Sequence, residues 1–161
     1  MKRIVPFLFL WIAFLAGCQD DGTRYHRYSA VPAEGWKPTD TLSFRLPARF
    51  TYHKYALEIG IRHGTVYPYQ DLWLAVIHPL TPALRPDTIH IQLADGQGNW
   101  LGKGTSGSQF QRAVPAGEII CFPADSLLQI VHLMKDSVLS GISDVGIRLA
   151  LPARIDAEKD K

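Results

Sequence analysis

The sequence has few cysteines and no excess of charge of one sign. Only two of its 161 residues are cysteines, Cys18 and Cys121, which excludes a disulfide framework or a zinc site of cysteine pairs. Cys121 lies in an apolar run and is expected to be buried. Lysine and arginine total 17 against 15 acidic residues, but Lys2 and Arg3 precede the predicted cleavage point. The mature chain then has no net charge, whereas nucleic-acid-binding proteins carry clustered cations.

Signatures of catalysis are also scarce. Six histidines are present, but no two have the spacing of metal ligands on one helix, and no HExxH or G-x-S-x-G motif occurs. The glycine-rich stretch 96–104 lacks the G-K-[ST] ending of a phosphate-binding loop. Acidic residues are scattered rather than paired as in glycosidases. We therefore predict a protein that is not an enzyme and holds no metal or other cofactor.

The N-terminal segment carries the most specific local pattern. A basic start precedes an apolar run over 4–15, which is shorter than the roughly 20 residues needed to span a bilayer. Leu15-Ala16-Gly17-Cys18 is a bacterial lipobox, in which small side chains precede a cysteine that receives a diacylglyceryl group. We predict a signal peptide at 1–17 and a lipid anchor in a membrane at Cys18. An ordinary secretory signal or an uncleaved anchor is the alternative.

The mature chain is divided by composition into a tether, one domain and a tail. Residues 18–29 are polar after the anchor and form either a short tether or an irregular first strand. Asp20 and Asp21 resemble the acidic export signals of Bacteroidetes lipoproteins, or simply begin a solvated linker. Residues 30–152 are expected to form the domain, and the highly charged residues 153–161 a frayed tail.

Alternation of apolar and polar residues predicts an all-β domain. We expect strands at 41–46, 54–62, 72–77, 88–93, 119–122, 127–133 and 145–151. Leu42 and Phe44 should face inward, as should Leu151 at the end of the last strand. Segment 72–77 is apolar on both faces and should be covered on both. Helices are limited to short turns near 123–126 and 139–141. Seven to nine short strands predict an antiparallel β-sandwich, of jelly-roll or immunoglobulin-like order.

Aromatic residues are the best candidates for a binding surface, because rings offer much contact area with few rotamers to restrict. A platform for sugars or peptide would draw on Trp36, Tyr67, Tyr69, Trp73 and Trp100. Burial is favoured for Trp73, which lies inside an apolar strand. Packing over one end of the sandwich is the alternative for Tyr67 and Tyr69.

Several blocks of sequence resemble the gliding-motility lipoprotein GldH family of Bacteroidetes. The specific blocks are Tyr67-Pro68-Tyr69-Gln70-Asp71-Leu72-Trp73-Leu74 and Gly98-Asn99-Trp100-Leu101-Gly102-Lys103-Gly104, in this order behind the lipobox. The resemblance covers nearly all of the mature chain. It implies an outer-membrane lipoprotein of the gliding machinery, or of the linked type IX secretion system, with envelope proteins as partners. The family has no assigned catalytic residues.

Two functions remain open at this stage. The first is a structural or assembly lipoprotein that acts by protein–protein contact. The second is a glycan-binding sandwich on the cell surface. The candidate partner or ligand surface consists of Trp36, Tyr67, Tyr69, Trp100 and Lys103. In the block Gly98–Gly104 the glycines should permit a tight turn with Trp100 packed across it.

Overall fold

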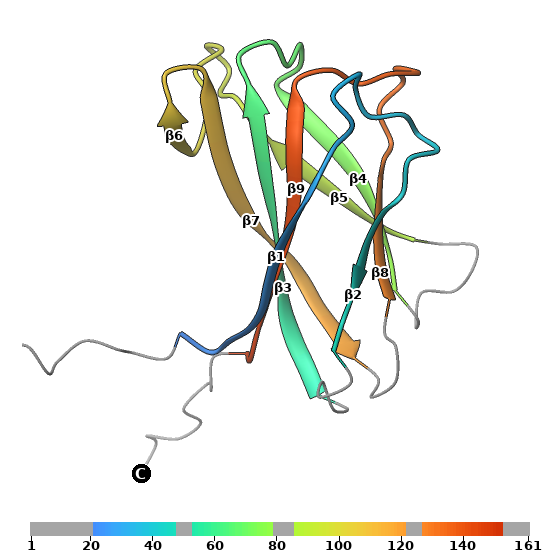
Figure 1. The fold of residues 1–161 in the computed structure, drawn as a ribbon. Helices are drawn as coiled ribbons and strands as arrows, with labels where there is room; N and C mark the ends of the chain where they lie inside the picture. Colours follow the sequence, from blue (N-terminus) through green and yellow to red (C-terminus); the bar gives the residue numbers. More distant parts are fainter. Residues whose placement is uncertain (1–20, 48–52, 79–85, 122–126, 153–161) are drawn as a thin grey trace, which may run out of the picture.

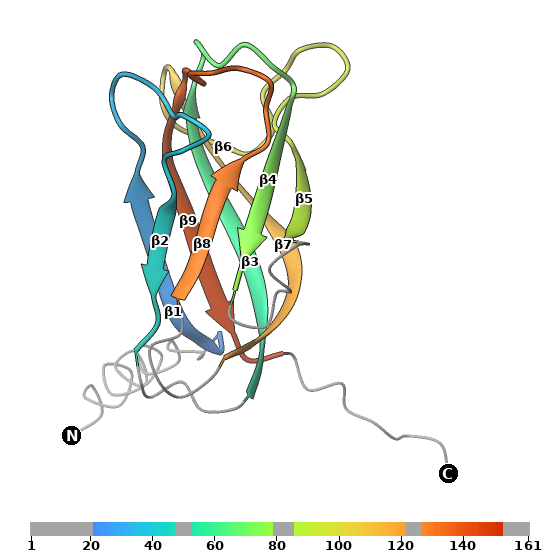
Figure 2. The same ribbon diagram turned by 90° about the vertical axis from the view of Figure 1, so that its right-hand side faces the viewer.

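The computed structural model describes residues 21–47, 53–78, 86–121 and 127–152. These residues form two packed antiparallel sheets and no helix (Figures 1 and 2). The strands are β1 (Thr23–Ala30), β2 (Leu42–Arg45), β3 (His53–Gly64), β4 (Asp71–Ile77), β5 (Asp87–Gln92), β6 (Lys103–Ser106), β7 (Gln109–Cys121), β8 (Leu127–His132) and β9 (Ile142–Ala150). Nothing in this part of the chain is a helix that could cross a membrane.

The order of the strands makes the sandwich a jelly roll. One sheet has the order β1-β9-β3-β7-β6 and the other β2-β8-β4-β5. The pairing is nested along the chain, because β1 pairs with β9, β2 with β8, β3 with β7 and β4 with β5. The chain therefore forms one long antiparallel ribbon that is rolled into two sheets. Pairing of β3 with β9 completes the first sheet, and pairing of β4 with β8 completes the second. The predicted antiparallel β-sandwich is confirmed, and of the two proposed orders the chain has the jelly-roll one.

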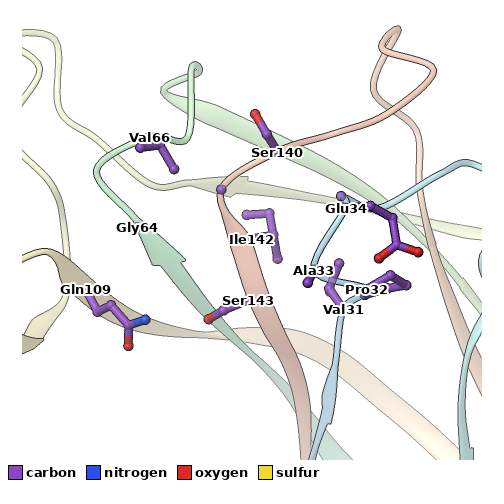
Figure 3. Close-up of a pocket in the computed structure, with 12 residues that line it drawn as sticks. Val31, Pro32, Ala33, Glu34, Gly64, Val66, Gln109, Ser140, Ile142 and Ser143 are labelled. Atoms are coloured by element: carbon purple, nitrogen blue, oxygen red, sulfur yellow. The ribbon is translucent and has the colours of Figure 1, made fainter.

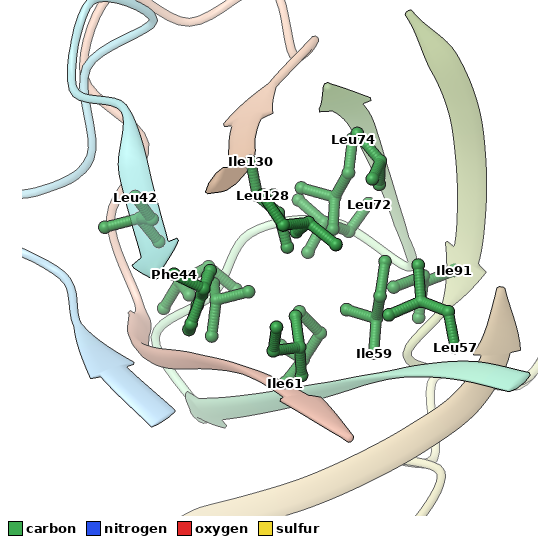
Figure 4. Packing of buried hydrophobic residues seen from close by; sticks show 14 of the residues in the cluster. Leu42, Phe44, Leu57, Ile59, Ile61, Leu72, Leu74, Ile91, Leu128 and Ile130 are labelled. Carbon is green, nitrogen blue, oxygen red and sulfur yellow. The ribbon is translucent and has the colours of Figure 1, made fainter. Parts of the chain in front are cut away.

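The core lies between the sheets and is built from the inward positions of alternating strands (Figure 4). Leu57, Ile59 and Ile61 of β3 face Leu72 and Leu74 of β4 across the interior, and all five side chains are buried. The expected inward residues of β2 and β9 are buried as well. Period-two alternation therefore predicted this part of the core correctly.

Two local predictions are wrong. Leu151 is 41% exposed rather than inward, because β9 ends at Ala150 and the chain leaves the sheet there. Segment 139–141 is not helical: Leu139 forms a backbone bridge with Trp36, and Gly141 has φ +85°. The other expected helix, the anchor Cys18, the tail and the side chain of Cys121 lie outside the described residues.

β6 and most of β7 were not predicted from the sequence pattern. The prediction placed a strand only at 119–122, whereas β7 runs over Gln109–Cys121. Its alternation is interrupted by Pro115 and by Gly117, which has φ +92° at a shift of register with β3. Bulges of this kind insert an extra residue and break the period-two signal. At the N-terminal end of the domain, Thr23–Ala30 is a strand. The sandwich therefore begins within segment 18–29, for which a tether and an irregular first strand were the two alternatives.

The sandwich has two distinct ends. Gly22 and Leu151, which are hydrogen-bonded through Leu151 N and Gly22 O at 3.0 Å, lie at one end, which we call the basal end. The connections 31–41, 65–70 and 133–141 gather at the opposite, apical end (Figure 1). The point of attachment of the N-terminal segment and the principal loops are therefore separated by the length of the strands.

Candidate functional site

A cluster of aromatic rings fills the core beneath the apical loops. His63 is fully buried, with ring centroids 4.7 Å from Trp100, 5.7 Å from Phe110 and 6.1 Å from Tyr67. Burial lowers the pKa of His63, and its Nε2 has no hydrogen-bond partner among the described residues. Tyr67 Oη donates to Asp71 O at 2.8 Å, and burial raises the pKa of this tyrosine. The cluster is therefore neutral and supports the loops above it.

The glycine-rich block forms a tight turn that delivers Trp100 to this cluster. The Asp95 carboxylate accepts hydrogen bonds from Gln97 N at 2.9 Å, Asn99 N at 2.9 Å and Asn99 Nδ2 at 3.0 Å. These bonds lower the pKa of Asp95. Gly98 within the turn has φ +84°. The predicted tight turn is present. Trp100 directly follows the turn, and its ring packs on His63, Tyr67 and Phe110 at the apical end of the core rather than across the turn.

Two of the five candidate surface residues lie in the core instead. Trp36 has no exposed surface; its Nε1 donates to Asp40 O at 2.7 Å and its ring meets the edge of His132 at 5.3 Å. Tyr67 is also buried. The loop 31–41 folds down over the apical end of the core and carries Trp36 inward, which local sequence does not reveal. Neither ring is on a surface that a partner could touch.

Tyr69 and Trp73 are the exposed members of the aromatic set. Tyr69 is 39% exposed and donates to Asp136 Oδ2 at 2.7 Å. Trp73 is 43% exposed and stacks on His90 with a centroid distance of 4.4 Å and an interplanar angle of 22°. His90 Nε2 lies 2.6 Å from Asp71 Oδ1. The expectation that Trp73 is covered on both faces is wrong, because the described residues cover only the inner face of this sheet.

Exposed side chains lie near Trp73 on the same face of the sheet, and we call them the outer patch. It consists of Trp73, Ile77, His90 and Leu133 on the outer face of the four-stranded sheet. His90 lies opposite Trp73 on β5, and Leu133 N donates to Trp73 O at 2.8 Å on the other side. Exposed aromatic and aliphatic side chains next to one another are typical of a contact surface.

The apical end also carries a cleft of about 490 Å³ (Figure 3). Its walls are segments 31–35 and 140–143, together with Gly64, Val66 and Gln109, and Glu34 is its charged side chain. A second cleft, of about 380 Å³, lies beside β6 and β7.

Lys103, the last candidate surface residue, lines this second cleft together with Arg112. Its side chain is exposed, and it lies on β6 at the edge of the five-stranded sheet. Neither cleft brings a histidine and a carboxylate together. In the described ranges, no three or more His, Cys, Asp or Glu side chains form a group that could hold a metal ion.

Comparison with known proteins assigns the chain to a family. The sequence profile of the GldH lipoproteins matches residues 23–149. The chain belongs to the GldH lipoprotein family. The gliding motility lipoprotein GldH of Flavobacterium johnsoniae is 25% identical over 150 residues, which cover 88% of this chain and 93% of that protein. The matched segment begins at the first residue of β1 and ends within β9, so the family domain is the jelly roll itself.

Similarity to solved structures is remote. A GH26-CBM35 β-(1,4)-mannanase of Podospora anserina is 14% identical, with 83% of this chain and 27% of that chain covered and a TM-score of 0.43. A GH115 4-O-methyl-α-glucuronidase is 15% identical, with coverages of 83% and 18% and a TM-score of 0.40. This chain thus spans about a quarter or less of those proteins, and scores of this size carry no functional argument.

Proposed function

We propose that this chain is lipidated at Cys18 and serves as an outer-membrane lipoprotein of the gliding-motility and type IX secretion apparatus. It acts without catalysis, through contacts with other envelope proteins. The observation that carries the proposal is the family match across the whole sandwich, from β1 to β9, behind a lipobox. The relative from Flavobacterium johnsoniae is named for gliding motility.

The geometry of the basal end supports an anchored, outward-facing domain. Three residues lie between Cys18 and Gly22, so the four steps along the chain span at most about 14 Å when extended. The Asp21 carboxylate accepts hydrogen bonds from Thr23 N at 3.0 Å and from Arg148 at 3.0 Å. A chain bound to the sheet so soon after the lipid would hold the basal end at the membrane. The apical loops would then face away from it.

Asp21 therefore has a structural role at the base of β1. The hydrogen bonds from Thr23 and Arg148 lower the pKa of its carboxyl group. The acidic pair of which it is a part was open to two interpretations, an export signal or the start of a linker. The contact with Arg148 joins the tether to β9, and an export role for Asp20 and Asp21 stays a prediction.

The outer patch supports a function in protein contact. Trp73 and Leu133 are each nearly half exposed. Trp73 lies on β4, and Leu133, directly after β8, is hydrogen-bonded to it through the backbone. Tryptophan and tyrosine are enriched at the centres of protein interfaces, where one apolar face excludes water. A preformed surface on paired strands loses little conformational entropy when a partner binds.

Controlled depletion in the native host tests the proposal. Release of type IX cargo into the medium and spreading of the colony are scored in the same cultures. Loss of both supports a role in the secretion apparatus, and loss of spreading alone narrows the role to motility. If both persist after depletion, the proposed function is wrong. Re-expression of Cys18→Ala tests the anchor, and we expect the variant to leave the membrane fraction.

Glycan binding is the second candidate, favoured by one observation. The exposed Trp73 ring lies beside His90 and the Asp71 carboxylate, which offers an aromatic face next to hydrogen-bonding groups. Purified protein and its Trp73→Ala variant would be titrated with surface polysaccharide of the host by calorimetry. Binding that the variant loses would support this candidate, and absence of heat with both proteins would refute it.

A further inference from the structure

We propose that β5 is a docking edge, at which an extended segment of a partner protein adds a strand to the four-stranded sheet. This inference rests on the proposed function and specifies how the contact with an envelope protein is made. β5 is the last strand in the order β2-β8-β4-β5 and pairs, among the described residues, with β4 alone (Figure 2).

The register decides which backbone groups of β5 point away from the sheet. Leu93 N donates to Gln70 O at 2.6 Å, directly after the strand. Hydrogen-bonded and non-hydrogen-bonded pairs alternate along an antiparallel ladder. The pairs formed by Ile91 and Ile89 with β4 are therefore hydrogen-bonded ones. The N–H and C=O groups of the residues between them point outward.

The backbone N–H and C=O groups therefore point outward at three alternate residues of β5, namely Thr88, His90 and Gln92. Their side chains are exposed, and they lie on the outer face of the sheet. A strand placed beside them would pair with these backbone groups in a regular ladder. Strand addition of this kind derives its affinity from main-chain hydrogen bonds.

The other three edges of the sandwich carry features that discourage pairing. β1 has Arg24 and Arg27 among its eight residues. β2 and β6 have only four residues each, and β6 contains Lys103 and Gly104. β5 has six residues, Asp87 followed by the sequence TIHIQ. It contains no lysine, arginine, proline or glycine. Short edges and edge charges, lysine above all, are the usual protection against an added strand. β5 is longer than β2 and β6, and its one charged residue, Asp87, stands at its first position.

The packing of β5 also favours a neighbour. Ile91 is completely buried, whereas Ile89, two residues earlier on the same inward face, is only half-buried. An added strand would place an apolar side chain next to Ile89 and extend the core over it. On the opposite face the new strand would lie beside His90, which stacks on Trp73.

Charge identifies the chemistry of the occupant. β4 and β5 carry two carboxylates, Asp71 and Asp87, and no lysine or arginine. Both carboxylates are about half exposed or more. Asp71 lies on the outer face of the sheet, beside His90, whereas Asp87 begins β5 on the same face as Ile89 and lies beside His78. The complementary strand therefore has Lys or Arg on its outer face, near Asp71, and apolar residues opposite Ile89 on its inner face, with a further basic residue where it passes Asp87. The exposed ring of Trp73 adds a cation–π partner for such a side chain. A second copy of this edge would bring two carboxylates and no lysine or arginine, and it therefore lacks that complementarity.

Site-specific photo-crosslinking in the native host tests the inference on the full-length, lipidated chain. The probe is p-benzoylphenylalanine at Gln92, whose position faces the proposed strand, and at His26 of β1 as a matched edge of the other sheet. Adducts are mapped by mass spectrometry. We expect Gln92 to crosslink to one extended segment of another envelope protein, with basic residues at alternate positions.

Two substitutions at Thr88 distinguish pairing from mere proximity. Thr88→Pro removes an outward N–H without removing a bond to β4, and Thr88→Lys repels a basic strand while keeping the backbone intact. Thr88→Pro should lower the Gln92 adduct by about tenfold, as expected for the loss of one or two hydrogen bonds. Thr88→Lys should also lower the adduct, through repulsion between like charges. His26→Pro, the same kind of change on the β1 edge, should leave it unchanged. Should the proline variant fail to accumulate, the lysine variant decides.

The opposite results overturn the inference without ambiguity. An absent adduct, an adduct that both Thr88 variants leave unchanged, or an adduct to a second copy of this chain would each refute the docking of a basic partner strand. Depletion is scored separately. If depletion abolishes spreading while Thr88→Lys spreads normally, the docking edge is wrong and the proposed function stands. If depletion has no effect, the proposed function itself is wrong.

Discussion

Gly146→Ala should destabilise the fold through a single aromatic ring. On the outer face of the five-stranded sheet Tyr28 of β1 lies opposite Gly146 of β9 and reaches across to Gly60 of β3. The guanidinium of Arg62 lies over the other side of the ring, 4.0 Å from its centroid. The two glycines, which are neighbours in the β3–β9 register, therefore form the floor on which the ring lies.

The magnitude follows from where the added carbon would be. A Cβ on Gly146 would lie 2.7 Å from Cδ1 and Cε1 of Tyr28 and 2.8 Å from its Cγ. These atoms include the base of the ring, so the side chain must leave the sheet rather than tilt. Overpacking of this kind costs about 1–3 kcal/mol, and loss of the cation–π contact about 0.5–1 kcal/mol. Replacing glycine in a strand returns about 0.5–1 kcal/mol. We expect a net loss of about 1–2 kcal/mol.

Urea denaturation of the purified domain measures the effect, and a double-mutant cycle assigns it to the ring. In the Tyr28→Ala background, Gly146→Ala should become neutral or stabilising by up to about 1 kcal/mol. Gly60→Ala should cost less than Gly146→Ala, because its Cβ meets the hydroxyl at the far end of the ring. Gly96→Ala is the control, since nothing lies within 4 Å of its Cβ. If Gly146→Ala costs the same with and without Tyr28, the reasoning is refuted.

Three further predictions follow from burial and backbone geometry. Trp36→Ala should lower the free energy of unfolding by about 3–5 kcal/mol, and Trp73→Ala should lower it by less than about 1 kcal/mol. Equal losses in urea denaturation would contradict the assignment of Trp36 to the core and Trp73 to the surface. Burial lowers the pKa of His63 in the folded protein, so the unfolded chain binds the proton more readily, and stability should fall as pH falls below about 6.5. His63→Phe should reduce this dependence between pH 7.5 and 5, and an unchanged slope would exclude the histidine as its source. Gly141 has φ +85°, and a Cβ at this position would lie 2.5 Å from backbone atoms of Tyr67. Gly141→Ala should therefore lower the free energy of unfolding by more than about 3 kcal/mol. Gly117→Ala, at φ +92° with nothing within 4 Å, should cost only about 1–2 kcal/mol in thermal unfolding.

Alternation was a reliable guide wherever one face of a strand meets the core. Leu42 and Phe44 of β2 are buried as predicted, and so are the inward residues of β3 and β9. The pattern is local, because successive side chains of a strand point to opposite faces whatever the partner strand is. The same rule failed for the first part of β7, where Pro115 and Gly117 interrupt the period.

The candidate surface was predicted less well, because exposure of an aromatic ring depends on distant segments. Trp36 is buried by its bridge to Leu139, a segment about a hundred residues later in the chain. Trp73 lies in an apolar run and is nevertheless exposed, because in the described residues only the inner face of its sheet is covered. His63 is buried because it continues the inward positions Leu57, Ile59 and Ile61 of β3. That alternation was the signal in the sequence that could have placed this histidine in the core.

By itself the sequence determined the fold class and the family, because both are written in local patterns: strands by alternating side chains, the family by blocks such as Gly98–Gly104 in order. The tertiary structure alone decided the jelly-roll order, since nested pairing joins residues from opposite halves of the chain. It also decided which rings face solvent and that β5 ends its sheet. Solvent exposure and unpaired edges depend on which segments pack together, and short-range pattern contains no information about that.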